Sequence, residues 1–335
     1  MLAPIRDHLR PRDPRSSPLL CAARDRYFSR LSVTVHPNTP RFEDARWIVL
    51  EDVNVEYLLD IFTSIDQTRG DIWDTCCHFL EHLIWHKPRQ TILGSKIEAL
   101  PDDHPSKSKC LTRLSWLFQQ VVGANRDLGL YEEGIQQAKE ALEFFERTNN
   151  TIAQAQALDD LARLLFDSNQ LDVAEDAASR AINLVPENGH DYLLCRLHRA
   201  LGRIHQSKGD KDKSIHHFRM ALGIASPFNW HTELFWVHYA LSDVFSNEDE
   251  FEDANVHIER AKAHAINNAY WLGRAMQMQA NVWYQQHRLG EAQSEVLRAL
   301  EVYEKLGAAK DVEYCRDLLQ KVEQATNDSS SGELL

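Results

Sequence analysis

Three histidines spaced along one expected helix are the side chains best placed for chemistry by sequence position alone. His78, Glu81 and His82 form the pattern H-x-x-E-H in an expected helix over 71–86, and His86 lies one turn further on. Histidines four residues apart share a helix face and can bind zinc, with the glutamate as a general base. The pattern is short, and zinc peptidases that carry it have mixed α/β domains, whereas this sequence indicates no strands. We favour ordinary helix packing; adventitious metal binding and a metal-dependent hydrolase are the alternatives.

Other catalytic signatures are missing from the sequence. Neither a nucleophile elbow, G-x-S-x-G, nor the phosphate-binding loop G-x-x-x-x-G-K-[ST] occurs in the 335 residues. The adjacent Cys76 and Cys77 lack the C-x-x-C spacing of a metal site. We therefore predict a protein that is not an enzyme, with no cofactor and no resident metal.

The charge balance argues against two classes of partner. The net charge is −13, which disfavours general binding to nucleic acid or to a membrane surface. No apolar run approaches the roughly 18 residues of a membrane span, and the N-terminus lacks the apolar core of a secretory signal. The six cysteines of such a chain suggest reduced thiols. We predict a cytoplasmic protein.

Small residues recur at a fixed step, and they determine the expected fold. One set is Gly134, Ala174, Ser214, Ala254 and Ala292, and an alanine follows seven residues after each of them. The steps within the set are 40, 40, 40 and 38 residues. Apolar residues at helical spacing divide each period into two helices. Small side chains in this register let neighbouring helices approach closely, so the pattern predicts an array of stacked helix pairs.

The chain as a whole then divides into four parts. Residues 1–17 contain three prolines and are expected to be irregular, and 18–105 are expected to form a helical linker segment. The array is expected over 106–325, as about five helix pairs and a C-terminal capping helix. Residues 326–335, TNDSSSGELL, are expected to be a disordered tail.

The repeat units resemble the tetratricopeptide (TPR) consensus. Leu201 and Gly202, then Ser214, Phe218 and Ala221, follow its pattern of L-G on the first helix and small–aromatic–small on the second. The resemblance implies an all-α fold: a TPR-like right-handed superhelical solenoid with helix-pair repeats of about 40 residues, longer than the common period of about 34.

Five stretches also resemble the C-terminal part of fungal (basidiomycete-type) NTPases of the NACHT/NB-ARC class, in which a P-loop ATPase precedes a TPR array. They are RDRYFSRLSV (24–33), FEDARWIVLEDVNVEYLLDIFTSID (42–66), HLIWHKPRQTILGSKIEALPDDHPSKSKCL (82–111), LGLYEEGIQQAKEALEFFER (128–147) and GIASPFNWH (223–231). Because the phosphate-binding loop is missing, ATPase activity is not implied. The chain is expected to be a truncated relative or the product of a split or incomplete gene.

In the TPR fold, four positions of each first helix face a concave groove. The resemblance places six arginines and two aspartates at those positions, within a region that is acidic in total. Arginine and aromatic side chains are enriched at protein interfaces. The predicted groove residues are Arg126, Arg163, Arg196, Arg199, Arg203, Trp236, Tyr239, Arg274 and Asn281. The alternative, that these arginines pair with acids on neighbouring helices, stays open.

These observations predict a non-catalytic scaffold whose groove, centred on Arg196, Arg199 and Arg203, binds a protein or peptide segment of acidic character. The family resemblance implies a role beside an NTPase module in signalling or assembly. A fragment without independent function is the remaining alternative.

Overall fold

The computed structural model describes residues 107–186 and 189–332. These residues form α-helices and a short 3₁₀ helix, with no strand among them. The parts predicted for 1–17 and 18–105, with the metal candidates His78, His82 and His86, lie outside the described residues. The chain divides into two compact units, 1–184 and 185–335, and each is described by itself.

Two helix pairs make up the described part of the first unit. They are α7 (Lys107–Asp127) with α8 (Tyr131–Arg147) and α9 (Thr151–Asp167) with α10 (Leu171–Leu184). Each helix packs on the next one in the chain, and α7 also packs on α9. The first helix of one pair therefore lies against the first helix of the next pair, which is the stacking that a helix-pair repeat requires.

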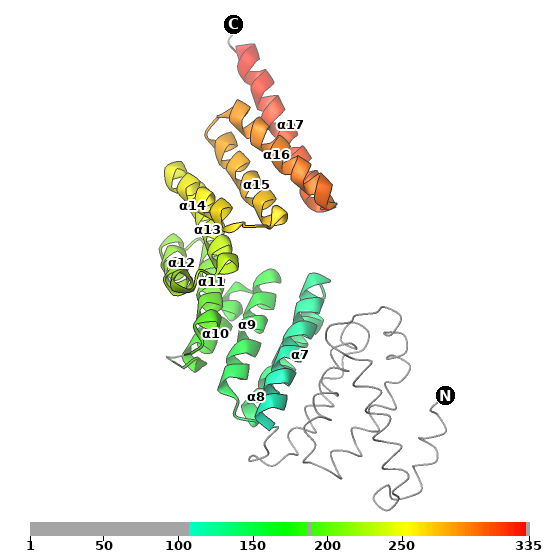
Figure 1. Ribbon diagram of the computed structural model, residues 1–335, viewed down its shortest axis with the longest axis vertical. Coiled ribbons are helices and arrows are strands. Elements are labelled where there is room, and N and C mark those ends of the chain that lie inside the picture. Colours follow the sequence, from blue (N-terminus) through cyan, green and yellow to red (C-terminus); the bar gives the residue numbers. More distant parts are fainter. Residues whose placement is uncertain (1–106, 187–188, 333–335) are drawn as a thin grey trace, which may run out of the picture. The chain divides into compact units, whose positions relative to one another are not determined.

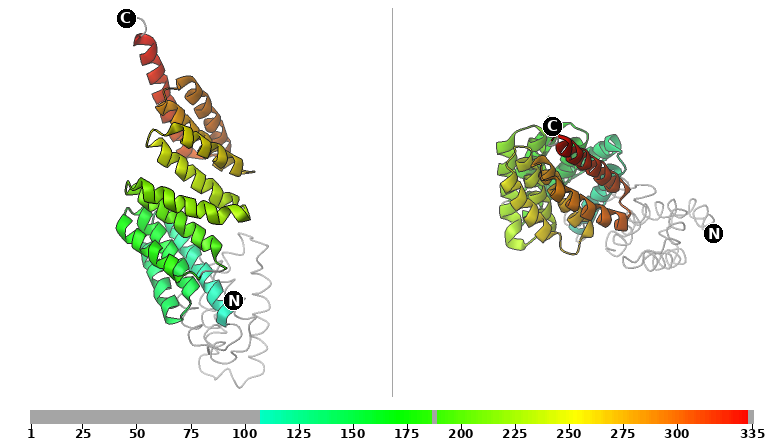
Figure 2. Two further views of the ribbon diagram at one scale, coloured as in Figure 1. Left: turned by 90° about the vertical axis from the view of Figure 1, so that its left-hand side faces the viewer. Right: turned by 90° about the horizontal axis from the view of Figure 1, so that it is seen from above.

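Three further pairs and a final helix form the second unit (Figure 1). The pairs are α11 (Asp191–Ser207) with α12 (Lys211–Ala225), α13 (His231–Ser246) with α14 (Phe251–His264), and α15 (Ala269–Gln285) with α16 (Leu289–Leu306). The 3₁₀ helix η2 (Ser226–Phe228) joins α12 to α13, and α17 (Ala309–Gly332) ends the unit. The first helices again pack in succession, α11 on α13, α13 on α15 and α15 on α17, and Figure 2 shows α13–α17 stacked from two other directions. The all-α, TPR-like repeat fold is confirmed.

The predicted small positions lie where neighbouring helices meet. Gly134 is buried, and Ala174, Ser214, Ala254 and Ala292 are all 0% exposed. The second set is equally buried: Ala141 is 1% exposed, and Ala181, Ala221, Ala261 and Ala299 are 0% exposed. Side chains larger than these would collide with the adjacent helix, which explains why the register holds across both units.

A left-handed residue follows the first helix of each described pair. These residues, Gly129, Asn169, Gly209, Asp249 and His287, have φ between 57° and 77°. In each case the next residue donates its backbone N–H to a carbonyl five residues earlier; Gln170 donates to Leu165 at 2.8 Å. This bond satisfies a carbonyl that the helix end leaves open and turns the chain back on itself. Glycine, asparagine and aspartate suit this conformation best.

The glycine at position 202 on α11 is explained by the residue that faces it on α12. A Cβ atom on Gly202 would lie 2.5 Å from Cε1 of the fully buried Phe218. One repeat earlier, the same two positions hold Ala162 and Ala178, which are both 0% exposed. A small residue on one helix thus accommodates a large one on the other, at the close packing typical of protein interiors.

The end of the chain differs from expectation. Residues 326–332 were predicted to belong to a disordered tail, but α17 continues to Gly332. The helix is held by its earlier turns, where Cys315 and Val322 are 0% exposed. Once a helix has formed, each added residue gains a backbone hydrogen bond at little further cost, so it extends past its last packed residue. Among the described helices, none is long and apolar enough to cross a membrane.

Candidate functional site

The predicted binding residues of the second unit come from successive first helices. Arg196, Arg199 and Arg203 are on α11, Trp236 and Tyr239 on α13, and Arg274 and Asn281 on α15. Side-chain contacts link these helices in order: Gln206 on α11 donates to Asp243 on α13 at 2.6 Å, and Asn281 on α15 donates to Tyr314 on α17 at 3.0 Å. We call this linked surface of α11, α13, α15 and α17 the first-helix face.

Two arginines of this face are paired with acids on the next first helix. Nε of Arg199 donates to Glu233 at 2.7 Å, and the carboxylate side chain is only 3% exposed. Arg274 lies 3.7 Å from Asp311, and its guanidinium also stacks over the ring of Tyr239, 5.2 Å from the ring centre. The positive charge of these two side chains is therefore partly compensated within the protein, as the open alternative anticipated. Arg196 and Arg203 are half-buried.

The predicted arginines of the first unit also lie beside carboxylates. Arg126 on α7 forms an ion pair with Asp167 on α9. Arg163 lies 3.8 Å from Asp160, three residues earlier on the same helix. Ion pairs of this kind, at partly exposed positions, contribute little to stability, but they lower the net charge that a ligand would meet. A binding role for any of these nine residues stays a prediction.

Aromatic side chains concentrate where α13 meets α15. The buried ring of Phe235 stacks on Trp271 at 5.1 Å, and Trp236 contacts Tyr239 and Trp271 edge to face at 5.9 and 6.3 Å. Trp236, Tyr239 and Trp271 remain partly exposed. Burial raises the pKa of the Tyr239 hydroxyl, so it stays a neutral donor. Rigid aromatic surfaces next to arginine are favourable anchors for a protein ligand.

Sequence reasoning missed a second aromatic group at the start of α11 and α13. Tyr192 and Phe228 are 47% and 52% exposed, and both contact the ring of Trp230, at 5.2 and 4.6 Å. Phe228 is held by the short helix η2, and Asn229 turns the chain with φ of 50°. The sequence signal was the segment PFNW between two helices, where large apolar residues surround a turn residue.

Chemistry by cysteine or by a metal cluster finds no support in the described residues. Burial is the main cause that raises the pKa of Cys195 to about 12 and that of Cys315 to about 11, so both stay as unreactive thiols. Across 107–186 and 189–332, no group of three or more histidine, cysteine, aspartate or glutamate side chains is placed to hold a metal ion.

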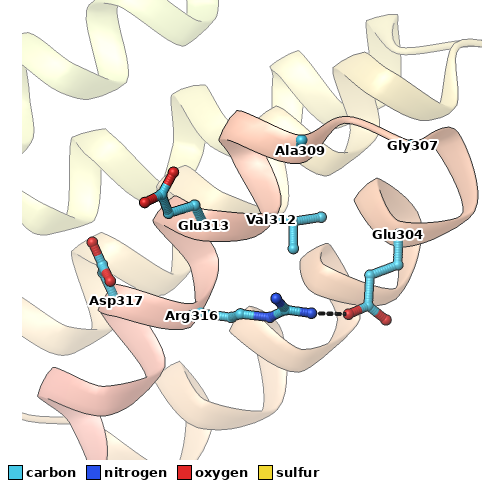
Figure 3. A pocket seen from close by; sticks show the side chains of 7 residues that line it. All are labelled: Glu304, Gly307, Ala309, Val312, Glu313, Arg316 and Asp317. Carbon is cyan, nitrogen blue, oxygen red and sulfur yellow. Dashed lines mark hydrogen bonds and ion pairs between the residues drawn. The ribbon is translucent and has the colours of Figure 1, made fainter.

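A pocket of about 550 Å³ lies between α16 and α17, away from the predicted residues. Figure 3 shows Arg316 reaching from α17 to Glu304 on α16, with an ion pair of 2.9 Å, while Glu313 and Asp317 lie on the side of α17 away from Arg316. The small and apolar residues Gly307, Ala309 and Val312 also line the pocket. The side chains of Arg316 and Glu304 are 63% and 50% exposed, so the pocket is a shallow surface feature.

Among known proteins, the chain is similar to solved structures of helical-repeat proteins. No family model matches it, and no curated protein sequence matches it either. Three solved structures illustrate the likeness.

A putative kinesin light chain from Podosopora anserina with TPR-like repeats is 12% identical, covering 58% of this chain and 97% of that chain, with a TM-score of 0.48. BtubC from P. vanneervenii is 18% identical, covering 59% and 92%, with a TM-score of 0.46. Aspartyl phosphate phosphatase F from Bacillus subtilis is 12% identical, covering 96% and 87%, with a TM-score of 0.49. At these identities the likeness concerns helical-repeat architecture alone.

Proposed function

We propose that this protein is a non-catalytic interaction scaffold and that the first-helix face of the second unit binds a segment of a partner protein. The observation that carries the proposal is the joining of arginine and partly exposed aromatic rings on one face, with Arg274 stacked over Tyr239 beside Trp236. Such side chains provide most of the binding energy at protein interfaces. A rigid stack of helices presents them with little ordering cost.

The acidic character of the ligand rests on Arg196 and Arg203. Both project from α11 at half-buried positions, seven residues apart and thus on one side of the helix. A guanidinium group binds carboxylates through two parallel hydrogen bonds. The ion pairs of Arg199 with Glu233 and of Arg274 with Asp311 join neighbouring first helices and hold the face in shape.

A selection from a displayed library of linear peptides tests the proposal. We expect selected peptides to be rich in aspartate, glutamate and apolar residues. The double variant Arg196→Glu/Arg203→Glu should weaken their binding at least about tenfold, which corresponds to about 1.4 kcal/mol. The matched control is Lys139→Glu/Arg219→Glu, which makes the same charge change at exposed positions of α8 and α12. Equal loss in both variants, or no effect in either, would remove the first-helix face from the proposal.

The link to an NTPase module is a separate part of the proposal. It is supported only by the resemblance of the five stretches to NACHT/NB-ARC proteins. Transcript sequence upstream of Met1 that encodes a P-loop in frame would support it. A stop codon in frame before Met1 would leave the scaffold function standing and remove a covalent NTPase module.

A further inference from the structure

Two helix pairs of the second unit carry histidines in contact between their helices. In α11–α12, Nδ1 of His198 lies 3.1 Å from Nδ1 of His217, and in α13–α14, Nδ1 of His238 lies 2.9 Å from Nδ1 of His257. Each position of the second pair follows its counterpart in the first by 40 residues, the repeat step. The same contact thus occurs at one register in two consecutive repeats.

Further histidines extend both pairs. The ring of His205 stacks on His217 with centroids 5.4 Å apart and planes 3° from parallel. The ring of His264 stacks on His238 at 5.8 Å and 4°, and its Nδ1 lies 3.2 Å from Nδ1 of His231. We call the resulting rows the histidine chains; they are His205–His217–His198 in one pair and His231–His264–His238–His257 in the next.

Each nitrogen–nitrogen contact fixes how many protons a pair can hold. One ring must donate its Nδ1–H and the other must accept, so the contact suits two neutral rings or one shared positive charge. A second proton places two N–H groups, each on a cationic ring, against one another at about 3 Å. In the interior this repulsion is strong, because little water screens it. His238 is 6% exposed and His205 is 3% exposed.

The charges around the chains add to this resistance. Arg260 on α14 faces both His238 and His257, and Arg219 on α12 also faces His257; Asp253 opposes them. His216 faces His198, and Asp210 lies near His205. Burial, the largest cause, lowers the pKa of His238 to about 3 and that of His257 to about 4. It also lowers the pKa of His198 and His264.

We propose that the histidine chains make α11–α12 and α13–α14 an acid-sensitive segment, which is packed at neutral pH and loosens when each Nδ1 pair takes up a second proton. The driving force is the difference between the folded and unfolded chain. A histidine in the unfolded chain takes up its proton near pH 6.5, whereas His238 and His257 stay neutral to about pH 3 and 4 when folded. Their contribution to stability is therefore complete above about pH 6.5 and is lost progressively as the pH falls below it.

The chain itself supplies the variant that tests this. In the first unit, the positions equivalent to His238 and His257 hold Leu158 and Ala177, which are buried at 0% and 3% exposure. The double variant His238→Leu/His257→Ala copies that apolar pair. The control, His287→Asn, removes an exposed histidine at a left-handed position that asparagine tolerates. All samples contain a chelator, so that no metal bridges the ring nitrogens.

Unfolding by urea is followed for the full chain at pH 7 and pH 5, where most exposed carboxylates are still ionised. Between these pH values, the unfolding equilibrium constant of the wild type should rise about 500-fold more than that of the double variant. The control should behave as the wild type. Equal pH dependence of the wild type and the double variant would overturn the proposal.

A second measurement does not depend on the variant folding. Nitrogen NMR of the wild-type imidazoles at pH 5.5 should show neutral rings for His238 and His257, with one Nδ1 protonated and the other not. Protonated rings for both residues in the folded chain would overturn the proposal by themselves.

Discussion

The pairs α9–α10 and α13–α14 share small residues where helices approach closely, but they differ in the residues buried between those positions. Both carry fully buried alanines where the next helix approaches, Ala174 and Ala181 in one and Ala254 and Ala261 in the other, and all four are 0% exposed. Between these fixed points, α9–α10 is filled with Leu158 and Ala177, whereas α13–α14 holds His238 and His257 at the same register.

A second position differs in the same way. Ala153 on α9 and Glu233 on α13 occupy one register, and each is 2% exposed. Glu233 and His238 each have a partner on another helix, Arg199 for Glu233 and His257 for His238. Burying a polar group without a partner is costly. The small positions thus set the helix spacing in both pairs, while Glu233 and His238 are buried in α13 beside a polar partner on a neighbouring helix.

Breaking the Arg199–Glu233 pair should give the largest effect. The change Arg199→Met leaves the Glu233 carboxylate buried without the Nε–H that now binds it at 2.7 Å. Removing one partner of a buried ion pair costs about 3–5 kcal/mol, and we expect about 3 kcal/mol because Arg199 is partly exposed. Urea unfolding at pH 7 measures it.

The double variant Arg199→Met/Glu233→Ala removes the pair altogether and gives α13 the alanine of α9. We expect it to regain most of the loss, because no buried charge remains. If the double variant is as unstable as Arg199→Met alone, the need for paired replacement is refuted.

Enlarging the shared alanines should damage both pairs alike. Ala181→Leu and Ala261→Leu each insert three carbon atoms at a position that is 0% exposed. Overpacking of this kind costs about 1–3 kcal/mol, and we expect values near 3 in both. The control Ala263→Leu, at an exposed position of α14, should cost less than about 0.5 kcal/mol. A clear loss of stability in one of the two variants and none in the other would show that the helix contacts of the two pairs differ.

Placing the histidine pair in the first unit should transfer its acid sensitivity to α9–α10. Leu158→His/Ala177→His should cost about 2 kcal/mol at pH 7, because two polar rings replace apolar contacts. The loss should grow as the pH falls below about 6.5, where the unfolded chain gains protons that the buried rings resist. Thermal unfolding at pH 7 and 5 measures both parts. Glu143→His, at an exposed position of α8, is the control; an equal acid response there would assign the effect to added charge alone.

The fold could be predicted from the sequence because close helix approach restricts residue type. Ala221 and Ala261 have no room for a larger side chain, so alanine recurs at this repeat position and the pattern can be read from the sequence. The pairing of the arginines was not predictable in the same way. Arg199 and Glu233 are 34 residues apart on different helices, and their contact depends on how α11 and α13 are rotated. A single helix pattern contains no information on that angle.

The histidine chains left a signal that a comparison of repeats would have found. His198 and His238 are one repeat apart, as are His217 and His257. Each alone looks like an ordinary residue of an amphipathic helix, and only the recurrence at both positions indicates a contact. The disordered tail was wrong for 326–332 because composition describes the local preference, whereas α17 is already formed by packing at Val322.

Substitutions in the left-handed turns after α9 and α13 should change stability least, and they test whether the two turns are held in the same way. Asn169 and Asp249 have φ of 62° and 60°. Replacement by alanine forces a Cβ-bearing residue without a local polar contact into this region, at about 1 kcal/mol. Replacement by glycine, as at Gly209, should change stability little. Asn247→Ala, where φ is −69°, controls for loss of a surface amide. Asn169→Ala should lower stability more than Asn247→Ala. If Asp249→Ala lowers stability no more than Asn247→Ala, the turn of α13–α14 is held by its neighbours rather than by its own backbone preference.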